Sequence, residues 1–137
     1  MLIVDTGPLL ATADRADPDH VVCRALLEAD LGPLVTTAMV IAEAAYLIDR
    51  QLGSAAEAEL YAAIISGQLE VADLVVEDWE RIKDLVTVYA DLRLGGTDAS
   101  VIALAERLGA TRIATLNRRH FGVVRPRHAI AFTLLPA

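Results

Sequence analysis

The sequence predicts a single α/β domain in which a short parallel β-sheet is flanked by helices. Short apolar segments rich in β-branched residues alternate with longer segments of helical character, which is typical of a parallel sheet with helical connections. The chain has 137 residues, 55% of them hydrophobic, which suits one domain with a substantial core. No linker, internal repeat or low-complexity segment interrupts it, so we expect one domain over residues 1–137.

The expected elements follow in order from these local patterns. Strands are expected over residues 2–4, 34–36, 69–71, 112–116 and 132–135. Helices are expected over residues 17–30, 37–52, 54–66, 77–92 and 97–108, with N-caps at Asp17, Thr37, Ser54 and Thr97. Glycines at positions 53, 67, 95, 96 and 109 end helices or separate them. Residues 5–8, Asp-Thr-Gly-Pro, are expected to form a loop after the first strand.

Several function classes are excluded by composition. No apolar segment reaches the ~20 residues needed to cross a bilayer, and no basic segment precedes an N-terminal apolar run, so we expect a cytoplasmic protein without membrane contact. The single cysteine, Cys23, rules out an internal disulfide and a cysteine-based metal cluster, and we expect it to be a small core residue.

Charge is divided unevenly along the chain. The net charge is −7, yet residues 107–137 contain no acidic residue. They carry six arginines, Arg107, Arg112, Arg118, Arg119, Arg125 and Arg127. These arginines either balance the acidic part of the chain within the fold or form an edge that faces phosphate groups.

Asp5 directly follows the apolar run of the first strand. In open parallel sheets, ligands bind at the carboxyl ends of the strands, and Asp5 and Asn117 both follow predicted strands. Asp5 is therefore a candidate metal ligand. The alternative is an N-cap or turn aspartate that begins the next helix.

Two further carboxylates lie on predicted helices. At about 100° per residue, Glu43 falls at the edge of its helix's apolar face, next to Val40 and Leu47, where it either borders a cleft or is solvated. Asp98 falls inside the apolar face of the 97–108 helix, whereas Ser100 falls outside it. The helix dipole explains an aspartate in the first turn but not on this face, because burying a carboxylate is costly unless it is paired or binds a metal.

Three carboxylates brought together repel one another, and a divalent cation removes that repulsion. Oxygen ligands suit Mg²⁺ or Mn²⁺, which can activate water and stabilise charge at phosphorus. Zinc prefers nitrogen and sulfur ligands, and only one such pair, His20 and Cys23, is available. The set Asp5, Glu43 and Asp98 thus predicts a Mg²⁺-dependent nuclease.

The residues around these carboxylates resemble the successive motifs of PIN-domain nucleases. The matching segments are Asp5-Thr6, Val40-Ile41-Ala42-Glu43, Leu94-Gly95-Gly96-Thr97-Asp98-Ala99 and Thr115-Leu116-Asn117-Arg118-Arg119-His120-Phe121. The resemblance covers essentially the whole chain, and length and motif style are most similar to VapC toxins, the ribonuclease halves of type II toxin–antitoxin modules.

This resemblance implies a Mg²⁺-dependent endoribonuclease acting on structured RNA, such as tRNA or the sarcin–ricin loop of 23S rRNA. It also implies a homodimer and neutralisation by a VapB-type antitoxin. By position, Asp5 and Asp98 would be metal ligands, and Glu43 would complete the site directly or through water. The last motif usually carries an aspartate where this chain has Asn117. The site therefore has one negative charge fewer than the usual PIN-domain pattern. Asp91 either compensates for this charge or is a surface residue, and its place near a helix C-terminus, where the dipole disfavours an acid, favours the surface.

Arg118 and Arg119 follow Asn117 directly and are candidate substrate-binding residues, because guanidinium groups suit phosphate oxygens. Few aromatic residues are present, which favours recognition of RNA by shape and backbone. Asn117 also keeps open a catalytically weak PIN-fold module that binds RNA or protein. A phosphoryl-acceptor receiver domain is disfavoured, since Asp5 has no acidic neighbour and the only lysine, Lys83, lies in a helix.

Overall fold

A computed structural model describes all 137 residues and confirms the predicted α/β fold class. The strands are β1 (Leu2–Val4), β2 (Leu34–Thr37), β3 (Glu70–Ala72), β4 (Arg112–Ala114) and β5 (Thr133–Leu135). The helices are α1 (Thr6–Ala13), α2 (His20–Ala29), α3 (Ala38–Leu52), α4 (Ser54–Ile65), α5 (Val76–Val88), α6 (Gly96–Leu108) and α7 (Arg118–Val123), with a 3₁₀ turn, η1 (Ala90–Leu92), between α5 and α6.

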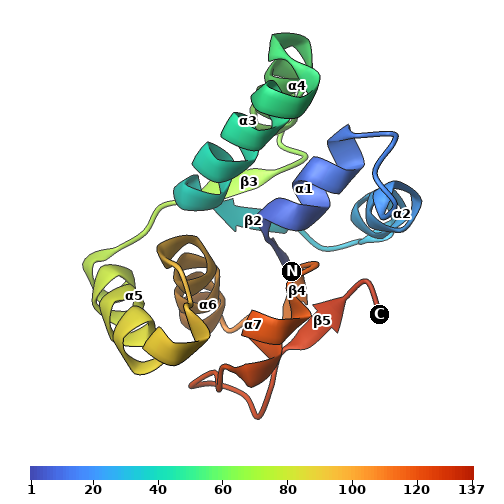
Figure 1. Cartoon of the computed structure of the whole chain (residues 1–137). Helices are drawn as coiled ribbons and strands as arrows, with labels where there is room; N and C mark the ends of the chain where they lie inside the picture. Colours follow the sequence, from blue (N-terminus) through green and yellow to red (C-terminus); the bar gives the residue numbers. More distant parts are fainter.

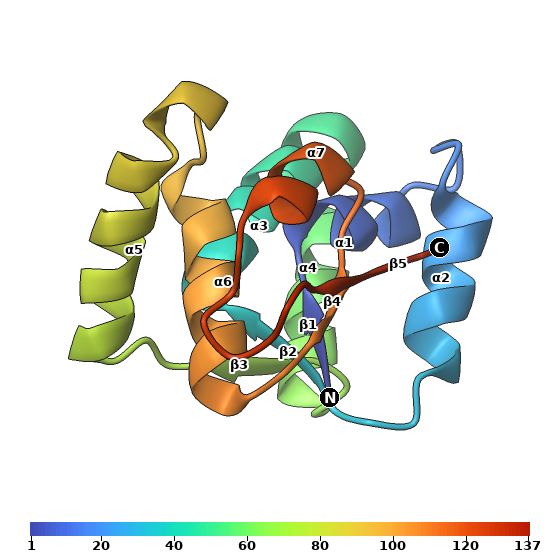
Figure 2. The ribbon, with the colours of Figure 1, turned by 90° about the horizontal axis from the view of Figure 1, so that it is seen from below.

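The five strands form one parallel sheet in the order β3-β2-β1-β4-β5. From β1 the chain first moves outward through β2 to β3, then crosses back to β4 and β5 on the other side of β1. Right-handed crossovers therefore place α1–α4 on one face of the sheet and α5–α7 on the other, as Figure 1 and Figure 2 show. The direction reverses between β1 and β4, and this is where open sheets of this kind form a crevice for ligands.

The core lies on both faces of β1 and around α6. Leu2, Ile3 and Val4 are fully buried, and every residue of α6 from 99 to 105 is buried too. Helix α6 is covered by the sheet on one side and by α5 on the other, so it has no solvated face along this stretch. The expectation that Ser100 lies outside a buried face was therefore wrong. Its hydroxyl donates to the Thr97 carbonyl at 2.6 Å and contacts the Thr37 hydroxyl at 2.9 Å, which satisfies it inside the core.

Several local expectations differ from the structure. Residues 6–8, expected in a loop, begin α1, and Pro8 is tolerated there because the first N–H groups of a helix have no intrahelical partner. Helix α2 begins at His20, since residues 17–19 form a turn in which the Asp17 carboxylate accepts the Asp19 N–H. Ser54 opens α4 without capping it, and Thr97 lies inside α6, whose N-cap is Gly95. The helix expected over 77–92 ends at Val88 and is followed by η1. Helix α7 was not expected at all. No helix is both long and apolar enough to span a lipid bilayer.

Candidate active site

Asp5 lies at the carboxyl end of β1, beside the end of β4. Its backbone N–H donates to the Ala114 carbonyl at 2.9 Å, which continues the pairing of the two strands. Its carboxylate oxygen Oδ2 accepts a hydrogen bond from the Thr115 hydroxyl at 2.8 Å. Asp5 occupies the N-cap position of α1, but its side chain makes no capping hydrogen bond, so its orientation is set by Thr115.

Thr115 was not singled out from the sequence, although it follows β4 directly. Besides donating to Asp5, its hydroxyl accepts the Asn117 backbone N–H at 3.0 Å. It is almost fully buried, at 1% exposure. A hydroxyl residue at the end of the strand beside β1 was the available signal, and it connects Asp5 to the turn that leads into α7.

The surroundings of Asp5 disfavour its ionised form. Only 5% of the residue is exposed. Burial is the main cause that raises the pKa of Asp5 to about 6, and the nearby charges of Asp98 and Glu43 raise it further. The Thr115 hydroxyl and the adjacent Thr6 backbone amide act in the opposite direction. A cation beside Asp5 would relieve both the desolvation and the repulsion.

Asp98 stands in the first turn of α6 and is paired with a histidine. Its Oδ2 lies 2.7 Å from Nδ1 of His120 on α7, and the two side chains are 18% and 19% exposed. His120 was named from the sequence within the segment that resembles the last PIN motif and was assigned no role of its own. Its pairing with Asp98 depends on α7, which the sequence analysis did not predict.

Asn117 is the N-cap of α7. Its Oδ1 accepts the His120 backbone N–H at 3.2 Å, and its Nδ2 lies 2.9 Å from the same ring nitrogen that faces Asp98. The structure thus brings Asn117, His120 and Asp98 together, and Asn117 makes its contacts with His120.

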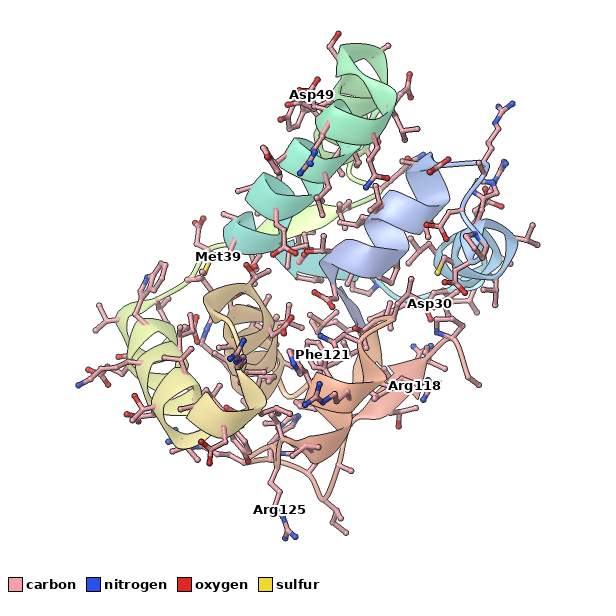
Figure 3. All side chains as sticks on the ribbon, in the orientation of Figure 1. Asp30, Met39, Asp49, Arg118, Phe121 and Arg125 are labelled. Atoms are coloured by element: carbon pink, nitrogen blue, oxygen red, sulfur yellow. The ribbon has the colours of Figure 1, made fainter.

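Glu43 approaches the site from α3. The first turns of α3 and α6 are in close contact, because a Cβ on Gly96 would lie 3.1 Å from Met39 Cε, and Figure 3 shows Met39 at this end of α3. Glu43 follows one turn later, is exposed, and is near enough to Asp5 to affect its pKa. Asp91 is exposed in η1 and makes no hydrogen bond or ion pair.

The two candidate substrate-binding arginines differ. The Arg118 guanidinium donates to the backbone carbonyls of Leu134 at 3.4 Å and Pro136 at 2.5 Å, beside β5 (Figure 3). Arg119 is exposed and has no acidic or carbonyl partner. The basic segment as a whole is divided in the same way, because Arg107 and Arg112 pair with Asp78 and Asp30, whereas Arg125 and Arg127 are exposed and form no ion pair.

The donor set of the site suits a hard divalent cation. Asp5, Asp98 and Glu43 offer only oxygen atoms, and the buried Thr6 hydroxyl beside them has no hydrogen-bond partner. No three His, Cys, Asp or Glu side chains converge closely enough to hold an ion as they stand. One or two carboxylates suffice for Mg²⁺, however, because it retains several of its water ligands. Asp5 and Asp98 therefore fit such an ion.

Comparison with known proteins shows the family of the chain. The model of the PIN domain family matches residues 2–125. The chain is 36% identical over 135 residues to ribonuclease VapC26 of Mycobacterium tuberculosis, and this alignment covers 98% of the chain and 100% of that protein.

Solved structures share the fold at lower sequence identity. VapC20 of M. tuberculosis, described as a toxin that cleaves the sarcin–ricin loop, superposes with a TM-score of 0.77 at 19% identity, covering 82% of this chain and 87% of that one. A chain of DNA-bound VapBC from Salmonella typhimurium superposes with a TM-score of 0.71 at 18% identity, covering 97% and 96%.

Proposed function

The chain belongs to the PIN-domain family, and within it to the VapC type, and we propose that it is a Mg²⁺-dependent endoribonuclease toxin. One observation carries this proposal. Asp5 is buried at the reversal point of the sheet, beside two other acids and without a cationic partner, and this raises its pKa to about 6. A buried carboxylate in such surroundings is costly to the fold and suits a bound cation.

We assign the metal ion to Asp5 and Asp98, with Glu43 completing the site directly or through a water molecule. When bound, Mg²⁺ would supply Lewis-acid stabilisation of the phosphorus centre and activation of the attacking water. Thr115 holds Asp5 in place through its 2.8 Å hydrogen bond. Arg119 is free to contact a phosphate of the substrate, whereas Arg118 is occupied by backbone carbonyls.

We propose a structured RNA as substrate, either tRNA or the sarcin–ricin loop of 23S rRNA. With two Phe, one Trp and three Tyr, the chain has few stacking side chains, which favours recognition of RNA shape and backbone. We also propose a homodimer that is neutralised by a VapB-type antitoxin. Structures of toxin–antitoxin complexes that share this fold support that partner.

The test is cleavage of total tRNA and of ribosomes in the presence of Mg²⁺, with RNA 5′ ends mapped by sequencing. Asp5→Ala and Asp98→Ala should each lower the rate by several orders of magnitude, because the metal supplies much of the barrier reduction. The control is Asp84→Ala, which removes an exposed acid of α5 that makes no side-chain hydrogen bond or ion pair and should leave cleavage unchanged. Wild-type rates in both site variants would refute the assignment.

Asn117 motivates the second candidate, a PIN-fold module that binds RNA or protein without turnover. The same assay separates the two, provided that RNA binding is measured alongside cleavage. Binding of RNA with no new 5′ ends, in Mg²⁺ and in Mn²⁺, would favour the non-catalytic module. Discrete 5′ ends that disappear in Asp98→Ala would exclude it.

A further inference from the structure

Three residues from two elements form a continuous chain of contacts next to the proposed metal ion. Asn117 Oδ1 accepts the His120 backbone N–H at 3.2 Å. His120 Nδ1 lies 2.7 Å from Asp98 Oδ2 and 2.9 Å from Asn117 Nδ2. The chain of contacts therefore runs from the N-cap of α7 through the imidazole to the carboxylate on α6.

The two contacts of Nδ1 cannot both be hydrogen bonds, because this atom has either a proton or a lone pair. An ionised carboxylate can only accept, and the Asn117 amide nitrogen can only donate. The contact with Asp98 is the shorter one and is charge-assisted, so with Asp98 ionised Nδ1 carries the proton and donates it. Asn117 then holds His120 through the backbone N–H alone.

We propose that His120 is a positioning residue, which holds Asp98 through Nδ1–H and leaves the other carboxylate oxygen for the metal ion. Asn117 acts through His120 by capping α7, and not as a metal ligand. This inference rests on the proposed metal site at Asp5 and Asp98. It explains how the chain functions with an amide where PIN-domain nucleases usually carry an acid.

The surroundings support a fixed His120. Phe121, the next residue of α7, is 1% exposed and anchors this short helix in the core. Figure 3 shows Phe121 between α6 and α7. Because His120 and Asp98 are both about four-fifths buried, neither side chain can rotate freely into solvent. Partners that orient a metal-binding side chain typically contribute 10–100-fold to metal affinity.

The first experiment measures Mn²⁺ and Mg²⁺ affinity of the full chain by titration calorimetry at constant pH, without RNA. An asparagine at position 120 places its N–H group near the position of Nδ1, whereas a glutamine places it near Nε2. His120→Gln should therefore lower Mn²⁺ affinity about 10–100-fold. His120→Asn should retain affinity within about threefold of the wild type, by the same reasoning from donor position.

The control for a merely structural effect is His128→Asn, because an asparagine places its N–H group near Nδ1 and so loses a bond made by Nε2. His128 also makes one ring hydrogen bond, from Nε2 to the Ala110 carbonyl at 2.6 Å, but it lies outside the site. This variant should lower the melting temperature without changing Mn²⁺ affinity. Equal Mn²⁺ affinity in His120→Gln and the wild type would overturn the role of His120, as would an equal loss in His120→Asn and His120→Gln.

The second experiment tests Asn117 with two substitutions. Asn117→Ala removes the cap, whereas Asn117→Ser keeps a capping oxygen. We expect Asn117→Ala to lower Mn²⁺ affinity as His120→Gln does, and Asn117→Ser to restore most of it. Loss in both variants would instead make the amide itself a ligand and overturn this part of the inference.

The outcomes of these measurements distinguish a failure of the positioning role from a failure of the proposed function. Cleavage of RNA together with unchanged Mn²⁺ affinity in His120→Gln refutes only the positioning role. Mn²⁺ binding with the expected pattern of variants, but without cleavage of any RNA, refutes only the ribonuclease. A wild-type protein that binds neither Mn²⁺ nor Mg²⁺ refutes both.

Discussion

Two buried aspartates of this protein have opposite surroundings. Asp78, on α5, is 2% exposed, accepts the Val75 backbone N–H at 3.0 Å and binds Nε of Arg107 at 2.9 Å. Asp5 is 5% exposed, has one hydroxyl donor and lies near two more acids. The first carboxylate is compensated by a cation of the chain itself, and the second is not.

The difference shows that the chain keeps a buried acid at Asp5 at a cost to its own stability. Between α5 and α6, a second pair, Arg81 with Glu106, adds two hydrogen bonds of 2.7 and 3.0 Å, so both acids there have guanidinium partners. Asp5, at the carboxyl end of β1, has no such partner. A buried carboxylate without a cationic partner lowers the stability of the fold unless a cation binds beside it. The surroundings of Asp5 therefore indicate a bound ion.

The largest expected effect on stability is that of Asp78→Ala. It leaves Arg107 without its carboxylate and removes the acceptor for the backbone N–H of Val75, the N-cap residue of α5. We expect a loss of about 3 kcal/mol in the free energy of unfolding, at the low end for a buried pair because the Arg107 side chain is 33% exposed and partly screened by water. Urea unfolding measures it.

The matched control is Asp84→Ala, which removes an exposed acid from the same helix and should change stability by less than about 0.5 kcal/mol. RNA cleavage below the melting temperature should be unaffected in both variants. A loss of cleavage in folded Asp78→Ala would contradict the separation between the two aspartates.

The sequence predicted the positions of the site residues better than those of the acids that pair with arginines, such as Asp78. Asp5 and Asn117 both follow strands, and parallel strands that are neighbours end at the same edge of the sheet, so their proximity follows from topology alone. The motif containing Asp98 placed it at the start of a helix, and the structure confirms that position. Their roles as ligands stay predictions.

The partners of these residues could not be predicted in the same way. His120 meets Asp98 because α7 turns the imidazole towards α6, and nothing in a six-residue helix beginning Arg-Arg-His reveals that orientation. Arg118 and Arg119 are identical in sequence terms, but the position of β5 beside β4 brings two carbonyls to Arg118 only. Such contacts depend on tertiary packing and not on local pattern.

Asp5→Asn should stabilise the metal-free protein while abolishing cleavage. The pKa of Asp5 is about 3.8 in the unfolded chain and about 6 in the folded one, so the folded protein binds more protons between these values and loses stability as the pH rises through them. The cost is complete above about pH 6.5. Asparagine avoids it, and we expect a gain of as much as about 3 kcal/mol at pH 7.5 in the presence of a chelator.

The control for this pH dependence is Asp30→Asn. Arg112 holds the pKa of Asp30 below its usual value, so this carboxylate stabilises the fold above about pH 4 and its contribution disappears as the pH falls below that value. The variant should thus lose stability at pH 7.5, by less than about 1 kcal/mol for a partly exposed pair. Melting curves from pH 4 to pH 8 should diverge in opposite directions for the two variants, and parallel curves for Asp5→Asn and the wild type would contradict the cost assigned to Asp5.

The smallest expected effect concerns two neighbouring arginines. Arg118 has hydrogen-bond partners in the free protein, and Arg119 has none. In the inactive Asp5→Asn background, Arg119→Ala should reduce the slope of the logarithm of RNA affinity against the logarithm of salt concentration by about 1, because one phosphate contact is lost. Arg118→Ala should leave that slope unchanged and lower the melting temperature, since its guanidinium holds the carbonyls of Leu134 and Pro136. Fluorescence anisotropy with labelled RNA at several salt concentrations measures the slopes. If both variants lowered the slope equally, Arg118 would contact an RNA phosphate as Arg119 does. Its hydrogen bonds to the two carbonyls would then form only in the free protein and would not permanently support β5.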